Sequence, residues 1–203
     1  MQITPQAQDK KRFGEVIEAS TIEFKAQCYE LYESPPLGSL VRTGDDSAVY
    51  GIVHDVATSS MDPGRHPIAR GRDEETEEAV YASNPQLSRL LVTEASLVVV
   101  GHRSSGEIRR QLPPLPPRIH SFVHRCAGEE LLEFAGSLEF FLPSLLASPV
   151  IAAPDDVVAA FLRLASTSHP DPQQYLLGAG RELARSLSND VRRLNNVLKR
   201  LSP

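Results

Sequence analysis

The sequence predicts an α+β protein, a six-stranded closed β-barrel followed by a C-terminal helical part. Before residue 126, apolar side chains alternate with polar ones or form short β-branched runs between turn residues, a pattern typical of strands. From Glu129 onward the apolar residues are spaced by three and four, which is typical of helices. With 203 residues, 41% of them hydrophobic and 23% charged, the chain is long enough to bury a core of its own.

Six strands are expected in the first part of the chain. The second shows the alternation most clearly, because Phe24, Ala26 and Cys28 share one face and polar residues occupy the other. The third and fourth flank Gly44-Asp45-Asp46, which predicts a hairpin. Closing the six strands into a barrel would remove their exposed edges. The expected strands are Phe13–Glu18, Glu23–Tyr32, Ser39–Thr43, Ala48–Ala57, Leu97–Val100 and Ile119–Arg125.

Two kinds of segment interrupt the strands. Thr58–Arg72 is rich in Ser, Pro, Gly and Arg and is predicted to be a long loop. Asp73–Ser83 places acidic residues at a predicted helix N-terminus, and a short helix is expected after Asn84-Pro85. The prolines of Leu112–Arg118 predict a rigid extended spacer, although the segment also fits the Pro-x-x-Pro-x-basic form that aromatic grooves recognise.

Helices are expected from Glu129 to the end of the sequence. The first should end before Pro143, the second should begin through Asp155, and the third should begin at Asp171-Pro172, an N-cap followed by a first-turn proline. We place the barrel at residues 11–126, with a helical insertion near 73–91, and the helical region at 127–203.

An apolar stripe with coiled-coil spacing follows in the last helical segment, which Ser188-Asn189-Asp190 can restart. The stripe is either a surface for another chain, which would be a protein partner or a second copy, or the face that packs on its own domain. Its residues are Leu187, Val191, Leu194, Leu198 and Leu201.

Three short glycine-based motifs carry a resemblance to a known family. They are Phe13–Phe24 (FGEVIEASTIEF), Gly38–Val41 (GSLV) and Tyr50–Val53 (YGIV). Together they resemble the HAS-barrel, the small β-barrel shared by HerA-type DNA translocases and the catalytic-ring subunits of the rotary ATP synthase. The loop Met61–Pro67 and the stretch Glu77–Gly101 look most similar to the compact cyanobacterial members that carry the barrel without an ATPase domain.

A departure from these relatives argues against enzymatic activity. HerA-type and ATP-synthase proteins bind nucleotide through a separate domain with a Gly-x-x-x-x-Gly-Lys-Ser/Thr loop, and this spacing occurs nowhere in the chain. Gly178-Ala179-Gly180 lacks the third glycine of a dinucleotide-binding fingerprint. We therefore expect no catalytic residue and no cofactor. In these relatives the barrel joins subunits or docks partners, and the resemblance implies that this role remains.

Metal-binding and nucleophile sites have less support than structural explanations of the same residues. His120, His124 and Cys126 share one face of the last expected strand, but a zinc site would need further ligands from other segments. The alternative is that Phe122 and Cys126 face the barrel interior and the histidines lie near its rim. Ser104-Ser105-Gly106 fits a turn better than a nucleophile elbow, so no metal or hydrolytic centre is expected.

An arginine-rich segment, residues 102–125, is the second candidate binding site. Its arginines outnumber its single glutamate and could contact phosphates, although only Phe122 is available for base stacking. The excess of 26 acidic over 21 basic residues in the whole chain argues against a dedicated nucleic-acid-binding protein. The candidate phosphate contacts are Arg103, Arg109, Arg110, Arg118 and Arg125.

The resemblance, together with the missing phosphate loop, implies a non-enzymatic interaction or assembly module whose barrel docks on a larger complex, one related to ATP-synthase or DNA-translocase machinery. The alternative is a nucleic-acid-binding accessory protein that uses the arginine-rich segment. No signal-peptide pattern is present, and no uncharged apolar run reaches the ~20 residues of a membrane helix. A cytoplasmic location, free thiols at Cys28 and Cys126, and no membrane insertion are therefore expected.

Overall fold

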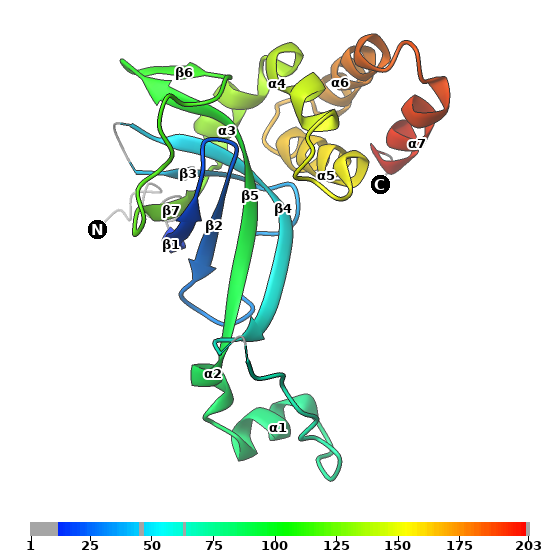
Figure 1. Cartoon of the computed structure of the whole chain (residues 1–203). Coiled ribbons are helices and arrows are strands. Elements are labelled where there is room, and N and C mark those ends of the chain that lie inside the picture. Colours follow the sequence, from blue (N-terminus) through cyan, green and yellow to red (C-terminus); the bar gives the residue numbers. More distant parts are fainter. Residues whose placement is uncertain (1–11, 45–46, 63, 202–203) are drawn as a thin grey trace, which may run out of the picture.

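The computed structural model describes residues 12–44, 47–62 and 64–201 (Figure 1). Within them it contains seven strands, all paired antiparallel, and seven helices, which confirms the predicted α+β class. Asp45-Asp46 of the predicted hairpin turn, Pro63 of the following loop and the N-terminal residues 1–11 lie outside the described residues.

The sheet joins every described strand. The order is β2-β1-β7-β3-β4-β5-β6, and β2 also pairs with β5. Six strands therefore pair in a ring, and β6 extends one end of β5 as a hairpin. The closed barrel stays a prediction. The strands are β1 (Arg12–Ala19), β2 (Glu23–Cys28), β3 (Leu40–Thr43), β4 (Val49–Ser60), β5 (Leu91–Ser104), β6 (Glu107–Arg109) and β7 (Phe122–Arg125).

Several strands differ from their predicted extents. β2 ends at Cys28 and not at Tyr32, because residues 29–32 form a bend and a turn in which Tyr32 has a φ of 67°. β5 begins well before the expected Leu97, because Thr58 and Thr93 pair across β4 and β5 although the sequence around them is polar. β7 begins at Phe122 and not at Ile119, because Ile119 and His120 form a turn in which His120 has a φ of 66°. β6 was not expected, since its three residues carry too little pattern.

The ring strands contribute to two hydrophobic clusters. One cluster draws on all six ring strands and consists of Val16, Phe24, Ala26, Val41, Val49, Val53, Ala95, Leu97, Val99 and Val123. Alternate residues of β3, β4 and β5, among them Leu40, Tyr50 and Val100, belong to the second cluster together with the C-terminal helices. Gly51 is required between them, because a Cβ there would lie 2.8 Å from Cε1 of Phe24.

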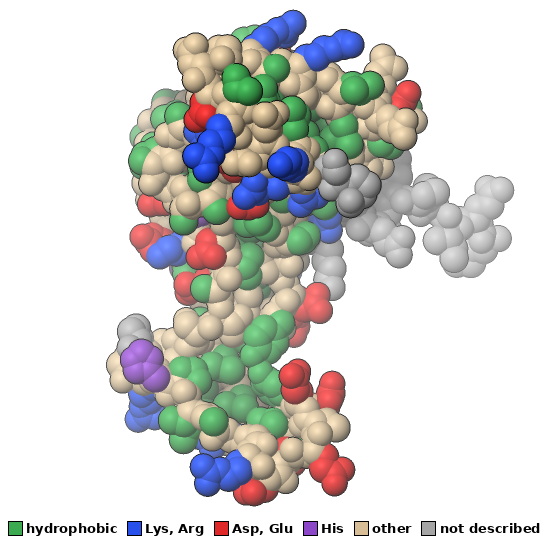
Figure 2. Space-filling model, turned by 90° about the vertical axis from the view of Figure 1, so that its right-hand side faces the viewer, with side chains coloured by type: hydrophobic (Ala, Val, Ile, Leu, Met, Phe, Trp, Pro, Cys, Tyr) green, Lys and Arg blue, Asp and Glu red, His purple; other side chains and the backbone are tan. Residues whose placement is uncertain are grey.

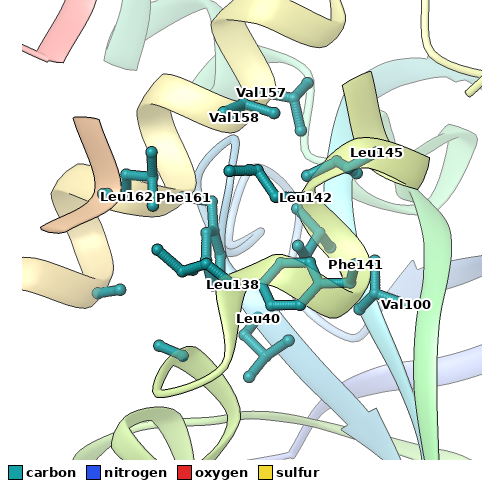
Figure 3. Packing of buried hydrophobic residues seen from close by; sticks show 14 of the residues in the cluster. Leu40, Val100, Leu138, Phe141, Leu142, Leu145, Val157, Val158, Phe161 and Leu162 are labelled. Carbon is teal, nitrogen blue, oxygen red and sulfur yellow. The ribbon is translucent and has the colours of Figure 1, made fainter. Parts of the chain in front are cut away.

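The C-terminal helices cover one end of the ring. Phe141 and Leu142 of α4 and Phe161 of α5 pack against Leu40 and Val100 of the sheet (Figure 3). Aromatic contacts continue this packing, since Phe141 lies 5.1 Å from Phe134 and 5.5 Å from Phe161 between ring centroids. The helices are α3 (Gly128–Ala135), α4 (Leu138–Leu146), α5 (Pro154–Ser166), α6 (Pro172–Ser186) and α7 (Val191–Leu201).

The helix starts are confirmed, but the end predicted for the first helix is wrong. Asp171 caps α6, because its carboxylate accepts the N–H of Gln174 at 2.9 Å, and Asp190 accepts the N–H of Arg193 at the start of α7. The first predicted helix instead divides after Ala135 into α3 and α4, so Pro143 lies inside α4. No helix in the described part of the chain is long and apolar enough to cross a membrane.

Candidate functional site

A projecting arm, residues 55–91, is the main feature outside the two clusters. It comprises the outer part of β4, the helices α1 (Glu77–Ser83) and α2 (Leu87–Leu90) and the first residue of β5. It extends from the end of the sheet opposite to α3–α7 (Figure 1). No described residue of the arm is buried. Its apolar side chains therefore remain available to a partner.

The arm projects from a two-stranded ribbon, in which residues 58–60 of β4 pair with residues 91–93 of β5. Val92 and Thr93 of this ribbon lie outside the arm and are buried. β5 pairs with β2 only from Glu94 onward, and β3 pairs with β4 only as far as Ile52. Across the ribbon, the hydroxyl oxygens of Thr58 and Thr93 lie 2.9 Å apart. A two-stranded hairpin is marginally stable by itself, and its unpaired edges offer backbone N–H and C=O groups. Contacts with other elements must therefore stabilise the arm.

The loop after β2 supplies one such contact. The N–H of Tyr32 donates to Oγ1 of Thr93 at 2.9 Å, and the hydroxyl of Tyr32 is hydrogen-bonded to that of Tyr81 in α1. The two rings meet edge to face with centroids 6.3 Å apart. This pair fixes α1 relative to the ring while both side chains remain exposed.

Polar contacts hold the end of the arm together. Thr76 caps α1 by accepting the N–H of Ala79 at 3.2 Å. Asn84 donates from Nδ2 to the carbonyl of Val80 at 2.9 Å and accepts from the guanidinium of Arg70 at 3.3 Å. The loop and both helices therefore keep their shape without a buried apolar side chain among their described residues.

A groove of about 460 Å³ lies between the loop after β4 and α2. Its apolar lining is open to solvent, since Met61 is 59% exposed, Ile68 70% and Leu90 45%. Three arginines also line it, Arg65, Arg70 and Arg89, and Asp62 pairs with the first at 3.4 Å. The lining of the groove therefore combines exposed apolar side chains with a net positive charge.

Charge is separated along the arm. Figure 2 shows apolar side chains in the middle of the arm, acidic side chains gathered on one side, and histidine and basic side chains on the other. Within the arm, residues 73–78 include five carboxylates, and four of these side chains are exposed. Such a surface suits a partner with the opposite distribution of charge.

The apolar stripe of the last helices packs within the chain. Leu187 and Leu201 are 7% exposed, and Leu194 and Leu198 pack against the helical cluster. Val197, which the stripe did not include, is fully buried there. Only Val191, at 62% exposed, remains open. The intramolecular interpretation accounts for this stripe, so it offers little surface to another chain.

Two of the five candidate phosphate contacts are engaged inside the protein. Arg103 donates from Nη2 and Nε to the hydroxyl of Tyr50 at 2.9 and 3.2 Å. Arg110 donates from Nε to the carbonyl of Phe134 at 3.0 Å and from Nη2 to the carbonyl of Glu133, at the end of α3. Their charges stabilise α3 against the sheet.

The other three arginines are exposed. Arg109 lies 3.9 Å from Glu107, and Arg118 precedes the turn before β7. Arg125 and Arg12 line a groove that also contains Glu30 and Glu33, so the charges of this groove balance. In the spacer between β6 and β7, Pro113 and Pro117 are buried, so they are not open to an aromatic groove of a partner.

A partly buried polar cluster joins the sheet to α3. Tyr50, fully buried, donates its hydroxyl to Glu130 at 2.9 Å, and Arg42 Nε lies 3.1 Å from the same carboxylate oxygen. Arg103 also bonds the hydroxyl of Tyr50, and the carboxylate of Glu130 therefore lies close to this hydroxyl and to two cations. Burial, followed by the charge of Glu130, raises the pKa of Tyr50 above its usual value. We call these residues the clasp.

The candidate metal ligands do not converge. His120 lies in the turn before β7 and bonds Glu15 at 3.1 Å. Cys126 is a buried free thiol in the helical cluster, and Phe122 is 43% exposed. The alternative that placed both facing the barrel interior is therefore wrong, because Val123 is the residue of β7 that joins the ring cluster. No group of three His, Cys, Asp or Glu residues in the described chain could hold a metal ion.

Sequence reasoning overlooked both the clasp and the arm. The clasp unites residues from β3, β4, β5 and α3 that are far apart in the chain, and no local pattern marks them. The arm had a visible signal, because a basic stretch ending at Arg72 directly precedes the acidic stretch from Asp73, between two β-branched segments.

The comparisons with known proteins add no identification. No model of a known protein family matches the chain, and no curated protein matches its sequence. The functional conclusion therefore rests on the arm and on the scaffold that carries it.

Proposed function

We propose that the chain is a non-enzymatic interaction module that docks on a larger complex, and that the arm is its docking element. The single observation that supports this most strongly is that no described residue between 55 and 91 is buried, although the segment exposes large apolar side chains. Monomeric proteins expose few contiguous apolar patches, and larger ones mark interaction sites.

The ring and the C-terminal helices form the scaffold in this proposal. A closed barrel of the HAS type belongs to it, supported by the ring of strand pairs and by Gly14 in β1, where a Cβ would lie 2.1 Å from the carbonyl oxygen of Gln27. A complex related to ATP-synthase or DNA-translocase machinery is the kind of assembly that such a barrel would serve. The nucleic-acid alternative has less support, because Arg103 and Arg110 bond within the chain.

One pair of substitutions tests the proposal. Ile68→Asp places a charge in the groove, and Leu177→Asp places the same charge on α6, where the side chain is similarly exposed, 66% against 70%. Both variants should unfold within about 2 °C of the wild type, because exposed positions tolerate polar residues. Only Ile68→Asp should lose association.

Association is measured by light scattering on the purified full chain and by co-purification from the native host. An Ile68→Asp variant that keeps every association of the wild type would refute the arm as docking element. A wild type that associates with nothing would refute the proposal as a whole.

A further inference from the structure

We propose that the arm binds the arm of a second copy of this chain, with α1 of each copy lying against the groove of the other. This inference rests on the proposed function, because it names the partner of the same docking element. It makes the protein a two-fold dimer joined through its arms, with the two sets of C-terminal helices at the outer ends.

The charges of the arm support this partner. The groove presents Arg65, Arg70 and Arg89 with only Asp62 against them, while the segment 73–78 presents five carboxylates. Oppositely charged surfaces increase the rate of encounter and exclude partners of like charge. Because both members of this complementary pair belong to one arm, a second arm is a partner that fits both.

The exposed apolar side chains of the groove and of α1 also complement each other. The groove exposes Met61, Ile68 and Leu90, and α1 exposes Tyr81 at 37% beside the half-buried Val80. A helix of seven residues is about 10 Å long, so a groove of about 460 Å³ accommodates side chains from one face of α1 and not the whole helix. Burying these side chains would supply the hydrophobic stabilisation that the arm lacks within one chain.

The position of the two surfaces favours a two-fold arrangement. The acidic side and the basic side lie on opposite sides of the arm, with apolar side chains between them (Figure 2). A two-fold axis through the middle of this face brings each acidic side against the partner's basic side, so that both contacts form at once. A stable interface needs about 20–30 residues a side, a number that residues 55–91 can supply.

Charge reversal provides the test. The first variant combines Arg70→Glu with Arg89→Glu, and the second combines Glu75→Arg, Glu77→Arg and Glu78→Arg, so that in each variant the groove and the segment 73–78 carry net charges of the same sign. The control combines Arg181→Glu with Arg192→Glu, two exposed arginines of α6 and α7. Sedimentation equilibrium on the full-length chain gives the dimer dissociation constant, and circular dichroism confirms the fold.

Each arm variant should dimerise at least about tenfold more weakly than the wild type, and the control should dimerise equally well. An equimolar mixture of the two arm variants should recover dimerisation, because both contacts in the mixed dimer are then attractive. The dissociation constant of the wild type should also rise between about 50 mM and about 500 mM salt.

Different results would refute the proposed dimer and the proposed docking role of the arm. A wild type that is monomeric at about 100 μM, or a mixture that does not recover dimerisation, would overturn the second copy as partner. If that monomer still binds another protein and Ile68→Asp abolishes the binding, the proposed function survives and only this inference fails. If Ile68→Asp leaves all binding intact, both fail.

Discussion

Replacing Tyr50 by Phe should destabilise the protein by about 2 kcal/mol, because a net hydrogen bond to a charged group contributes about 1.5–3 kcal/mol. The substitution removes the donor to Glu130 at 2.9 Å and the acceptor of two bonds from Arg103, and it keeps the ring, which packs 5.2 Å from Phe134. Glu130 retains Arg42, so the loss stays below that of an isolated buried charge. In a chain of this length the midpoint of thermal unfolding should fall by about 4–8 °C.

Tyr29→Phe is the matched control. Tyr29 donates one hydrogen bond to Glu15 at 2.9 Å, but its side chain is 47% exposed, so its loss should cost less than about 0.5 kcal/mol. Thermal and urea unfolding monitored by circular dichroism measure both variants. A Tyr50→Phe variant no less stable than Tyr29→Phe would show that the clasp does not stabilise the contact between sheet and helices.

The wild type and the Tyr50→Phe variant should also differ in how their stability depends on pH. Burial raises the pKa of Tyr50 in the folded state, so the folded state holds this proton more tightly than the unfolded state does. The resulting stability is fully present below the unfolded pKa of about 10 and is lost as pH rises above it. The stability difference between wild type and Tyr50→Phe should therefore shrink above about pH 10. A difference that grows there would contradict the assignment.

Three further outcomes are expected. Cys28 and Cys126 should react slowly with thiol reagents in the native protein, since both are buried and burial raises the pKa of each thiol, and Cys28→Ser should cost about 1 kcal/mol or more. Val197→Asp should lower the unfolding midpoint by several degrees, whereas Val191→Asp should leave it unchanged, because the first side chain is fully buried and the second is 62% exposed; equal midpoints would contradict the packing of α7. Calorimetric titration with Mg-ATP should give no micromolar binding, since the chain has no phosphate loop.

Local sequence patterns were sufficient to predict a helix or strand where one face of that element is buried. The alternation Phe24, Ala26, Cys28 predicted β2, and all three side chains are buried. The N-cap and proline pair Asp171-Pro172 predicted the start of α6 to the residue. In both cases a backbone requirement or a hydrophobic period lies within a few adjacent residues, so it can be recognised without knowledge of the rest of the fold.

Contacts between segments far apart in the sequence could not be predicted from local patterns. The polar stretch Thr58-Ser59-Ser60 looks like a loop, yet each residue pairs with β5, because strands outside the core need no apolar face. Pro143 suggested a helix end, but the chain breaks earlier, at Gly136, and starts a new helix that includes the proline. The stripe from Leu187 to Leu201 showed its apolar period but not what covers it. Only the positions of α5 and α6 decide that.

The strand β4 connects the clasp and the ring cluster to the exposed arm. β4 begins at the clasp with Tyr50, passes the ring cluster at Val53 and ends in the exposed arm at Ser60. The two clusters are buried and the clasp is partly buried, so substitutions there should change the stability of the fold. No described residue of the arm is buried, so substitutions there should change association at almost constant stability. Stability and docking should therefore respond independently to mutation on opposite sides of Val53. This independence follows from the burial pattern along β4 and holds whichever partner the arm binds.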